Sequence, residues 1–211
     1  DGNTADFDRT IAEDIELYLY DGQGKKIDER HIPYENIKGG KPYPLELPYS
    51  GNAYLVAWTL TGDEDIKKVS PALFDDENYA TARFSMSEHT TRGASSYNGS
   101  IQELFLKSMA FTQNPQENRT LNVDVRKQLC SISVTIEEGG NFATQYPGIL
   151  SMAIYGSSYS YNVAEDKQNG GRIVIEDSFS YMESSNEYVA ENKVMPASFD
   201  SATGQGDNIV V

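Results

Sequence analysis

The apolar residues of the stretch Leu121–Glu138 change phase partway along, and this change constrains the fold more than any other feature. They occupy odd positions in the first half (Leu121, Val123, Val125) and even positions in the second (Ile132, Val134, Ile136). Successive side chains of a β-strand point to opposite sides, so one regular strand cannot bury both sets against one core. Either a β-bulge lies near Lys127–Leu129, or the chain leaves one core there and enters another. We favour the second interpretation, in which one β-domain ends where the next begins.

A hairpin is predicted near the start of the chain. Ile15, Leu17 and Leu19 alternate with Glu and Tyr, which is the period-2 pattern of a half-buried strand. The segment Asp21–Gly24 follows, and its two glycines can adopt the positive φ angles of a tight turn. The chain then returns through Lys25–Ile27, so we expect two antiparallel strands joined at this turn.

The segment Ala53–Leu60 is apolar nearly throughout, which predicts a central strand covered on both sides. One face would carry Tyr54, Val56, Trp58 and Leu60, and the other Leu55, Ala57 and Thr59. Shorter strands are predicted at 80–86, 104–109, 149–155, 172–176 and 187–195, with a turn at Asn169–Gly171. No long segment has a helical period. The predicted class is therefore all-β, with short strands arranged as a sandwich.

Charge and composition exclude several classes of partner. The 211 residues carry a formal net charge of -15, which makes nucleic acid and anionic membrane surfaces improbable partners. No run of about 18 apolar residues is present, so no transmembrane segment is expected. No charged-then-apolar leader opens the chain, so an export signal would lie outside it. The single cysteine, Cys130, forms no intramolecular disulfide, and within a strand pattern we expect a buried thiol.

The sequence carries no recognisable catalytic or metal-binding set. His31 and His89 lack the spacing of a metal cluster and are expected at the solvated surface. No Gly-x-Ser-x-Gly elbow or phosphate-binding loop occurs. Three acidic groups could in principle bind calcium, but solvated loops are the simpler explanation (Asp6/Asp8, Asp63/Glu64/Asp65, Asp75/Asp76/Glu77). We therefore predict no catalytic, cofactor-binding or metal-binding residues and no cofactor, although a distant pair of glycosidase carboxylates stays open.

Clustered tyrosines admit two explanations. Tyr18 and Tyr20 lie in the first predicted strand, and Tyr155, Tyr159 and Tyr161 lie in a later Ser/Tyr-rich run. Such rings could stack on sugars, but aromatic pairing between neighbouring strands is the commoner arrangement. The first explanation supports a carbohydrate-binding module, and the second a purely structural role.

Three segments, in order, resemble the FimB-like family of fimbrial anchors and minor fimbrial subunits of Bacteroidales. They are the first strand–turn–strand, IELYLYDGQGKKI (15–27), a "Y-x-hydrophobic-hydrophobic-x-W" strand, AYLVAW (53–58), and a crossing strand, RKQLCSISVTI (126–136). The resemblance implies two transthyretin-like (Greek-key) β-sandwich domains in tandem, over residues 1–121 and 122–211. The second domain would be incomplete in this chain. It also implies a non-enzymatic structural protein, exported to the cell surface and outer membrane within a fimbrium.

The same resemblance predicts how the protein would assemble. Its partners would be other fimbrial subunits, joined through strand exchange by β-strand addition. Some family members attach to the membrane through a lipid on an N-terminal cysteine. Cys130 lies in mid-chain, so such an anchor would be absent from this chain. The terminal triplet Ile209–Val211 is expected to open a strand that the chain does not finish. The alternative function is a carbohydrate-binding surface module, which the tyrosines and acidic loops favour.

Overall fold

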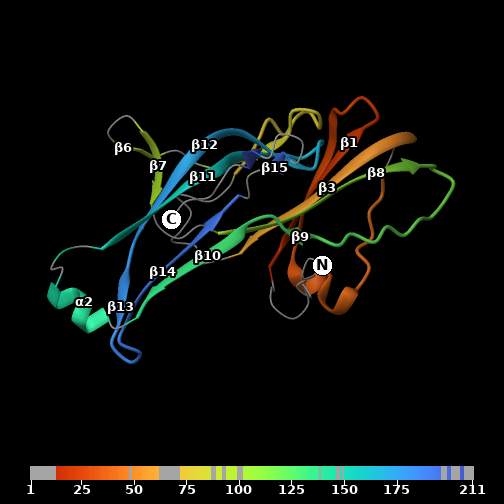
Figure 1. The fold of residues 1–211 in the computed structure, drawn as a ribbon. Helices are drawn as coiled ribbons and strands as arrows, with labels where there is room; N and C mark the ends of the chain where they lie inside the picture. The colour runs from red at the N-terminus through yellow and green to blue at the C-terminus, as the bar shows by residue number, and fades with distance from the viewer. Residues whose placement is uncertain are drawn as a thin grey trace.

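The chain folds mainly into β-strands (Figure 1). The computed structural model describes residues 13–47, 49–61, 72–86, 89–91, 94–98, 102–137, 139–145, 148, 150–195, 199–200 and 205–206. The predicted β class is therefore confirmed for most of this part of the chain. The exceptions among the described residues are two 3-10 turns and the seven-residue helix α2 (η1 Tyr34–Asn36, η2 Lys38–Gly40, α2 Gly139–Gln145). No described helix is long and apolar enough to cross a membrane.

The first sheet is antiparallel and has five strands in the order β2-β1-β3-β8-β9. Its strands are β1 (Ile15–Asp21), β2 (Lys26–Ile32), β3 (Gly51–Thr61), β8 (Glu103–Gln113) and β9 (Arg126–Lys127). The predicted hairpin is confirmed as β1–β2. In its turn, Asp21 Oδ1 accepts hydrogen bonds from the backbone N–H groups of Gln23 and Lys25, each at 2.9 Å. Gly24 has a φ of 84°, the positive value expected of a glycine there.

Two further sheets contain most of the remaining strands. A three-stranded sheet has the order β10-β14-β13, and a six-stranded sheet has the order β4-β5-β11-β12-β7-β6. The three-stranded sheet comprises β10 (Cys130–Ile136), β13 (Ser180–Met182) and β14 (Glu187–Val194). The six-stranded sheet comprises β4 (Ala72–Phe74), β5 (Arg83–Ser85), β6 (His89–Thr91), β7 (Ala94–Asn98), β11 (Ser151–Asn162) and β12 (Lys167–Ser178). A separate hairpin pairs β15 (Phe199–Asp200) with β16 (Gln205–Gly206).

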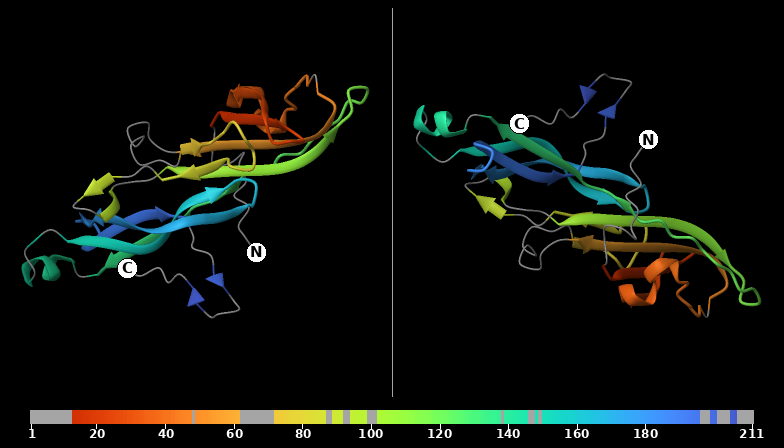
Figure 2. Two further views of the ribbon diagram at one scale, coloured as in Figure 1. Left: turned by 90° about the horizontal axis from the view of Figure 1, so that it is seen from above. Right: turned by 90° about the horizontal axis from the view of Figure 1, so that it is seen from below.

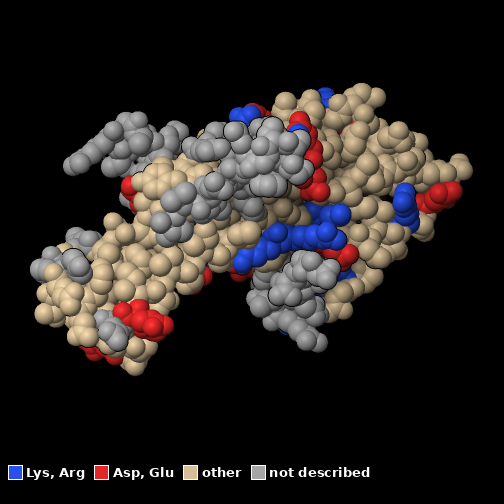
Figure 3. Space-filling view, in the orientation of Figure 1, with Lys and Arg blue, Asp and Glu red and all other residues tan. Residues whose placement is uncertain are grey.

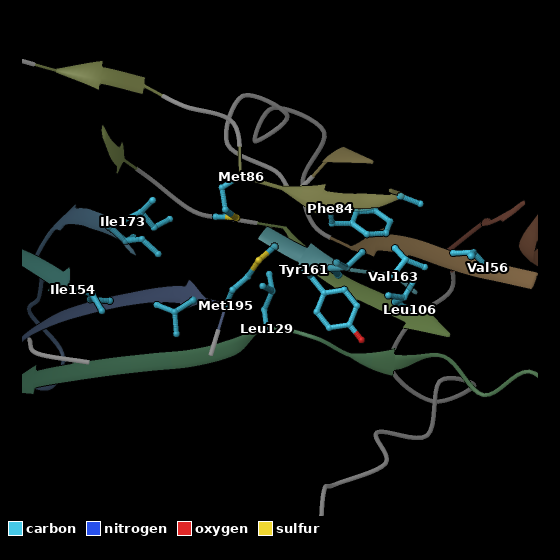
Figure 4. Packing of buried hydrophobic residues seen from close by; sticks show 14 of the residues in the cluster. Val56, Phe84, Met86, Leu106, Leu129, Ile154, Tyr161, Val163, Ile173 and Met195 are labelled. Carbon is cyan, nitrogen blue, oxygen red and sulfur yellow. The ribbon is translucent and has the colours of Figure 1, made fainter. Parts of the chain in front are cut away.

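The main hydrophobic core lies between the sheets. The five-stranded sheet forms one layer, and β11, β12 and β14 lie on the other side of this core (Figure 2). Buried side chains from distant parts of the sequence meet there, among them Val56, Phe84, Leu106, Ile154 and Met195 (Figure 4). Burial of this apolar surface is the dominant favourable contribution to folding.

A second core covers the opposite face of the five-stranded sheet. It contains Leu17, Leu55 and Phe111, and the connecting segment after β2 packs on it through Tyr43 and Leu45. The two faces predicted for the central strand are confirmed in β3. Even-numbered residues from Tyr54 to Leu60 belong to or pack on the main core, and Ala53, Leu55 and Ala57 belong to the second.

The phase change in the stretch 121–138 marks a passage between these two cores. Leu121, Val123 and Val125 pack against the second core, whereas Ile132 and Val134 pack against the main core. The interpretation that the chain leaves one core and enters another is therefore confirmed. The six-stranded sheet takes strands from both sides of residue 121, and the predicted division into domains 1–121 and 122–211 stays a prediction.

One local expectation was wrong. The turn predicted at Asn169–Gly171 lies inside β12, and the turn between β11 and β12 is at Val163–Asp166, where Asp166 has a φ of 51°. Consecutive glycines are a turn signal, but the residues on either side of this pair, Asn169 and Arg172, pair with β11, and the glycines lie at a register shift inside the strand. Gly139 and Gly140, which follow the end of β10, open a short helix that the sequence did not indicate.

Candidate interaction surface

β10 lies at an edge of the three-stranded sheet. It pairs with β14 in a regular antiparallel register from Cys130 opposite Val194 to Ile136 opposite Tyr188. Within the part of the chain that the structure describes, no strand pairs with its other side. Alternate residues of such a strand direct their backbone N–H and C=O groups away from the sheet, so β10 can accept another strand.

The two faces of β10 differ in polarity but not in charge. Ile132 and Val134 are half-buried against the main core, opposite Asn192 and Ala190 of β14. On the other face, Ser131, Ser133 and Thr135 are exposed. None of these side chains carries a formal charge. The β-branched residues suit an extended strand, and the exposed hydroxyls do not prevent another strand from approaching.

The start of β10 is fixed where the chain leaves the five-stranded sheet. Leu129 is buried in the main core (Figure 4), and the backbone N–H of Gln128 donates to the carbonyl oxygen of Leu104 at 2.8 Å. Cys130, the next residue, is exposed. The expectation of a buried thiol was therefore wrong, because Cys130 begins an edge strand at the passage between two sheets and nothing described covers it.

The far end of β10 leads to an aromatic tip that α2 forms with the β13–β14 turn. The backbone N–H groups of Gly139 and Gly140 donate to the carbonyl oxygen and to Oδ1 of Asn186, at 2.7 and 2.9 Å. A Cβ on Gly139 would lie only 3.0 Å from the ring of Tyr188 and 3.1 Å from that of Tyr181. A larger residue at position 139 would therefore have to displace these rings, although Tyr181 itself is 41% exposed.

The opposite edge of the fold, β2, is built differently. Lys26 Nζ lies 2.9 Å from Asp76, 3.0 Å from Glu77 and 3.1 Å from Glu29. Burial alone would lower the pKa of Lys26, but the hydrogen bonds that its ammonium group donates to these carboxylates outweigh burial and raise the pKa. The N–H of Lys26 also donates to the carbonyl oxygen of Glu77 at 3.0 Å, so part of this edge is already covered.

The predicted polar groups do not converge on one site. Asp76 and Glu77 pair with Lys26, and Asp75 pairs with Arg83 at 3.1 Å. The other two acidic groups lie outside the described residues. His89 belongs to β6, but its side chain is outside the description. Among the described residues, no three His, Cys, Asp or Glu side chains are arranged to hold a metal ion.

His31 is exposed, as predicted, but it is not isolated. Nδ1 lies 2.6 Å from Glu16, its cross-strand neighbour, and Nε2 lies 3.1 Å from Asp14. The hydrogen bond and charge of Glu16, with the charge of Asp14, raise the pKa of His31 above its usual value. The sequence alone did not indicate the contact between Glu16 and His31, because these residues become neighbours only through the hairpin register.

Most of the clustered tyrosines belong to the core. Tyr18 stacks on Trp58 with ring centroids 6.3 Å apart, and burial raises the pKa of Tyr18 to about 12. Tyr20 is fully buried against Tyr79. Tyr161 is buried too, and its hydroxyl donates to Asp166. The structural explanation therefore holds for these tyrosines.

The Ser/Tyr-rich run also presents one ring to solvent. Tyr159 packs partly against the main core, whereas the side chain of Tyr155 is 51% exposed. Register shifts against β12, between Tyr155 and Ser157 and again between Ser158 and Ser160, interrupt the regular alternation of β11. The three tyrosines therefore do not form the single exposed row that sugar stacking would need.

Comparison with protein families gives one match over nearly the whole chain. A model of the family described as fimbrillin-A associated anchor proteins Mfa1 and Mfa2 matches residues 1–205. A comparison with curated protein sequences finds no match.

Several solved structures share the fold. A candidate adhesin from Bacteroides ovatus has a TM-score of 0.63 and is 16% identical, covering 90% of this chain and 64% of its own. A Bacteroides thetaiotaomicron structure, described as a candidate polysaccharide-binding protein, has a TM-score of 0.63 at 13% identity. The match covers 92% of this chain and 70% of that protein. The fimbrial anchor protein Mfa2 from Porphyromonas gingivalis has a TM-score of 0.57 at 11% identity. This match covers 94% of this chain and 73% of that protein. The chain thus spans about two thirds of the length of these proteins.

Proposed function

Because the chain belongs to the family of fimbrillin-A associated anchor proteins Mfa1 and Mfa2, we propose that it is a structural component of a bacterial fimbrium. Its role is that of an anchor or assembly protein at the cell surface, with no catalytic step. The proposal includes two transthyretin-like domains in tandem, divided near residues 121 and 122. It also includes export to the outer membrane, with any lipid attachment made through a residue outside this sequence.

The open edge of β10 carries the proposal. A strand from another fimbrial subunit adds to β10, and its backbone groups pair with those that β14 leaves free. Alternate side chains of the added strand then extend the core face formed by Ile132 and Val134. Such a joint combines a ladder of main-chain hydrogen bonds with apolar burial, so it should dissociate slowly.

Adjacent proline substitutions test this joint. In an antiparallel strand, successive N–H groups point alternately toward β14 and away from it. Of Ser131→Pro and Ile132→Pro, one therefore removes a bond to β14 and lowers the melting temperature. The other removes only an outward donor. The second variant should keep its melting temperature within a few degrees while losing the complex with purified fimbrial subunits.

The matched control is a pair of adjacent proline substitutions on the other edge strand, β2. Glu29→Pro and Arg30→Pro lie on β2, where one of the two likewise removes only an outward donor. Neither control should affect the complex beyond its effect on stability. A complex that forms equally well with both β10 prolines would show that assembly uses an ordinary surface contact.

A carbohydrate-binding module is the second candidate. Tyr155 is 51% exposed, and one structural relative is described as a candidate polysaccharide-binding protein. A glycan array separates the two functions. Micromolar binding to a defined sugar, lost in Tyr155→Ala and retained in Tyr181→Ala, would favour this candidate.

A further inference from the structure

Basic side chains form a stripe where β9 passes into β10 (Figure 3). We define the basic stripe as Lys107, Lys127 and Lys193. In the β8–β9 register, Lys127 lies opposite Phe105, which is two residues from Lys107 on the same face of β8. Its Nζ also lies 3.5 Å from Ser131 Oγ, and Ser131 pairs with Lys193 of β14. The stripe thus joins the edge of the five-stranded sheet to the start of the open edge.

The basic stripe stands out because the chain as a whole is acidic, with a formal net charge of -15. Lys127 pairs with Glu103 at 2.5 Å. No carboxylate of the described residues lies within ion-pair distance of Lys107 or Lys193. By contrast, Lys26 on β2 contacts three carboxylates. Clustered cations without counter-charges create a positive potential, which favours an anionic partner.

We propose that the strand that adds to β10 carries acidic residues at the end that lies against the basic stripe. This inference rests on the proposed function. β10 runs from the stripe at Cys130 to the aromatic tip at Ile136. The acidic residues would therefore lie at the C-terminal end of an antiparallel incoming strand, or at the N-terminal end of a parallel one. They guide the strand to β10 and set its register.

The arrangement favours a polypeptide over an anionic glycolipid. The stripe is continuous with unpaired backbone through Ser131, and backbone groups are what an added strand requires. All side chains of β10 are uncharged, so charge on β10 cannot distinguish one register of the incoming strand from a register shifted by two residues. Acidic residues against Lys127 and Lys193 would supply that distinction.

Charge reversal tests the inference on the intact chain. Lys107→Glu combined with Lys193→Glu reverses the two cations of the stripe that have no carboxylate partner among the described residues. The matched control, Lys25→Glu with Lys41→Glu, makes the same change in net charge at exposed positions elsewhere. Association rates with purified fimbrial subunits are measured over a range of NaCl concentrations. The stripe variant should associate at least about tenfold more slowly at low salt, with the difference shrinking at high salt. The control should stay within about twofold of wild type.

Three other outcomes would overturn the inference. If the stripe variant associates normally while a β10 proline still abolishes the complex, strand addition stands and the acidic partner does not. If the unmodified chain forms no complex with any fimbrial subunit, the proposed function fails and this inference fails with it. If the stripe variant loses binding only to lipopolysaccharide vesicles, its ligand is an anionic glycolipid.

Discussion

The two edge strands β2 and β10 have the same length and opposite chemistry. Five of the seven residues of β2 are titratable, and the 77–79 segment covers its start through the N–H of Lys26. β10 carries no charge and pairs on one side alone among the described strands. Charged side chains are a common protection of an edge against unwanted pairing. The comparison indicates that one edge is closed to other chains and the other is left open.

The sheets behind these edges differ in the same sense. The five-stranded sheet has a hydrophobic core on each face. The three-stranded sheet packs one face on the main core, and its other face presents Ser131, Ser133 and Glu191 to solvent. We therefore expect the first sheet to supply most of the folding free energy and the second to supply the assembly surface.

The largest expected effect concerns aromatic residues in the two sheets. Trp58 packs between Tyr18 and Phe84, so Trp58→Ala should lower the free energy of unfolding by about 3–5 kcal/mol. Tyr188 is half-buried in the three-stranded sheet, and Tyr188→Ala should cost about 1–2 kcal/mol. Urea unfolding measures both changes. Equal losses would remove the energetic difference between the sheets.

A conservative variant separates packing from hydrogen bonding at Trp58. Its buried indole Nε1 has no hydrogen-bond partner among the described residues. Trp58→Phe keeps much of the ring packing and removes this unpaired group, so it should cost less than about 2 kcal/mol. A loss as large as that of Trp58→Ala would mean that Nε1 has a partner essential to the fold.

A smaller effect is expected at the charged edge. The Lys26 side chain is 14% exposed and contacts three carboxylates, so Lys26→Met should lower the free energy of unfolding by about 1–2 kcal/mol. Lys38→Met is the control. The ion pair of Lys38 with Glu35, at 3.2 Å, has both side chains exposed and should contribute less than about 0.5 kcal/mol. If the two variants are equally stable, the three carboxylates do not hold β2 in place.

The smallest effect is a pH dependence at the other end of β2. Glu16 and Asp14 raise the pKa of His31 from 6.5 in the folded protein. Protonated His31 therefore stabilises the fold fully below about pH 6.5, and this contribution is lost as the pH rises through the raised folded-state value. Melting curves between pH 5 and about pH 9 should show the decline in wild type and a smaller one in His31→Gln. Identical pH profiles would contradict it.

Local signals in the sequence predicted the parts of the fold that local physics determines. The β1–β2 turn follows from Asp21 and two glycines, and the two faces of β3 follow from its continuous apolar run. The passage between cores was visible because strand side chains alternate strictly, so a change of phase requires a change of environment.

Features that depend on distant pairing were not visible. Cys130 is exposed because of its place at a sheet edge, and the contact of His31 with Glu16 depends on the hairpin register. The position of Gly170 inside β12 depends on the pairing of Asn169 and Arg172 with β11. The basic stripe was missed for the same reason, since Lys193 is far in sequence from Lys127 and approaches it through Ser131 in the β10–β14 ladder.

Amide hydrogen exchange of β2 and β10, in the free chain and in complex with a fimbrial subunit, tests the central claim most directly. In the free chain, alternate amides of β10 should exchange rapidly because they point away from β14. In the complex, these same amides should become protected, while exchange in β2 should not change. A stable complex that leaves the β10 amides unprotected, or that protects β2 instead, would contradict the account.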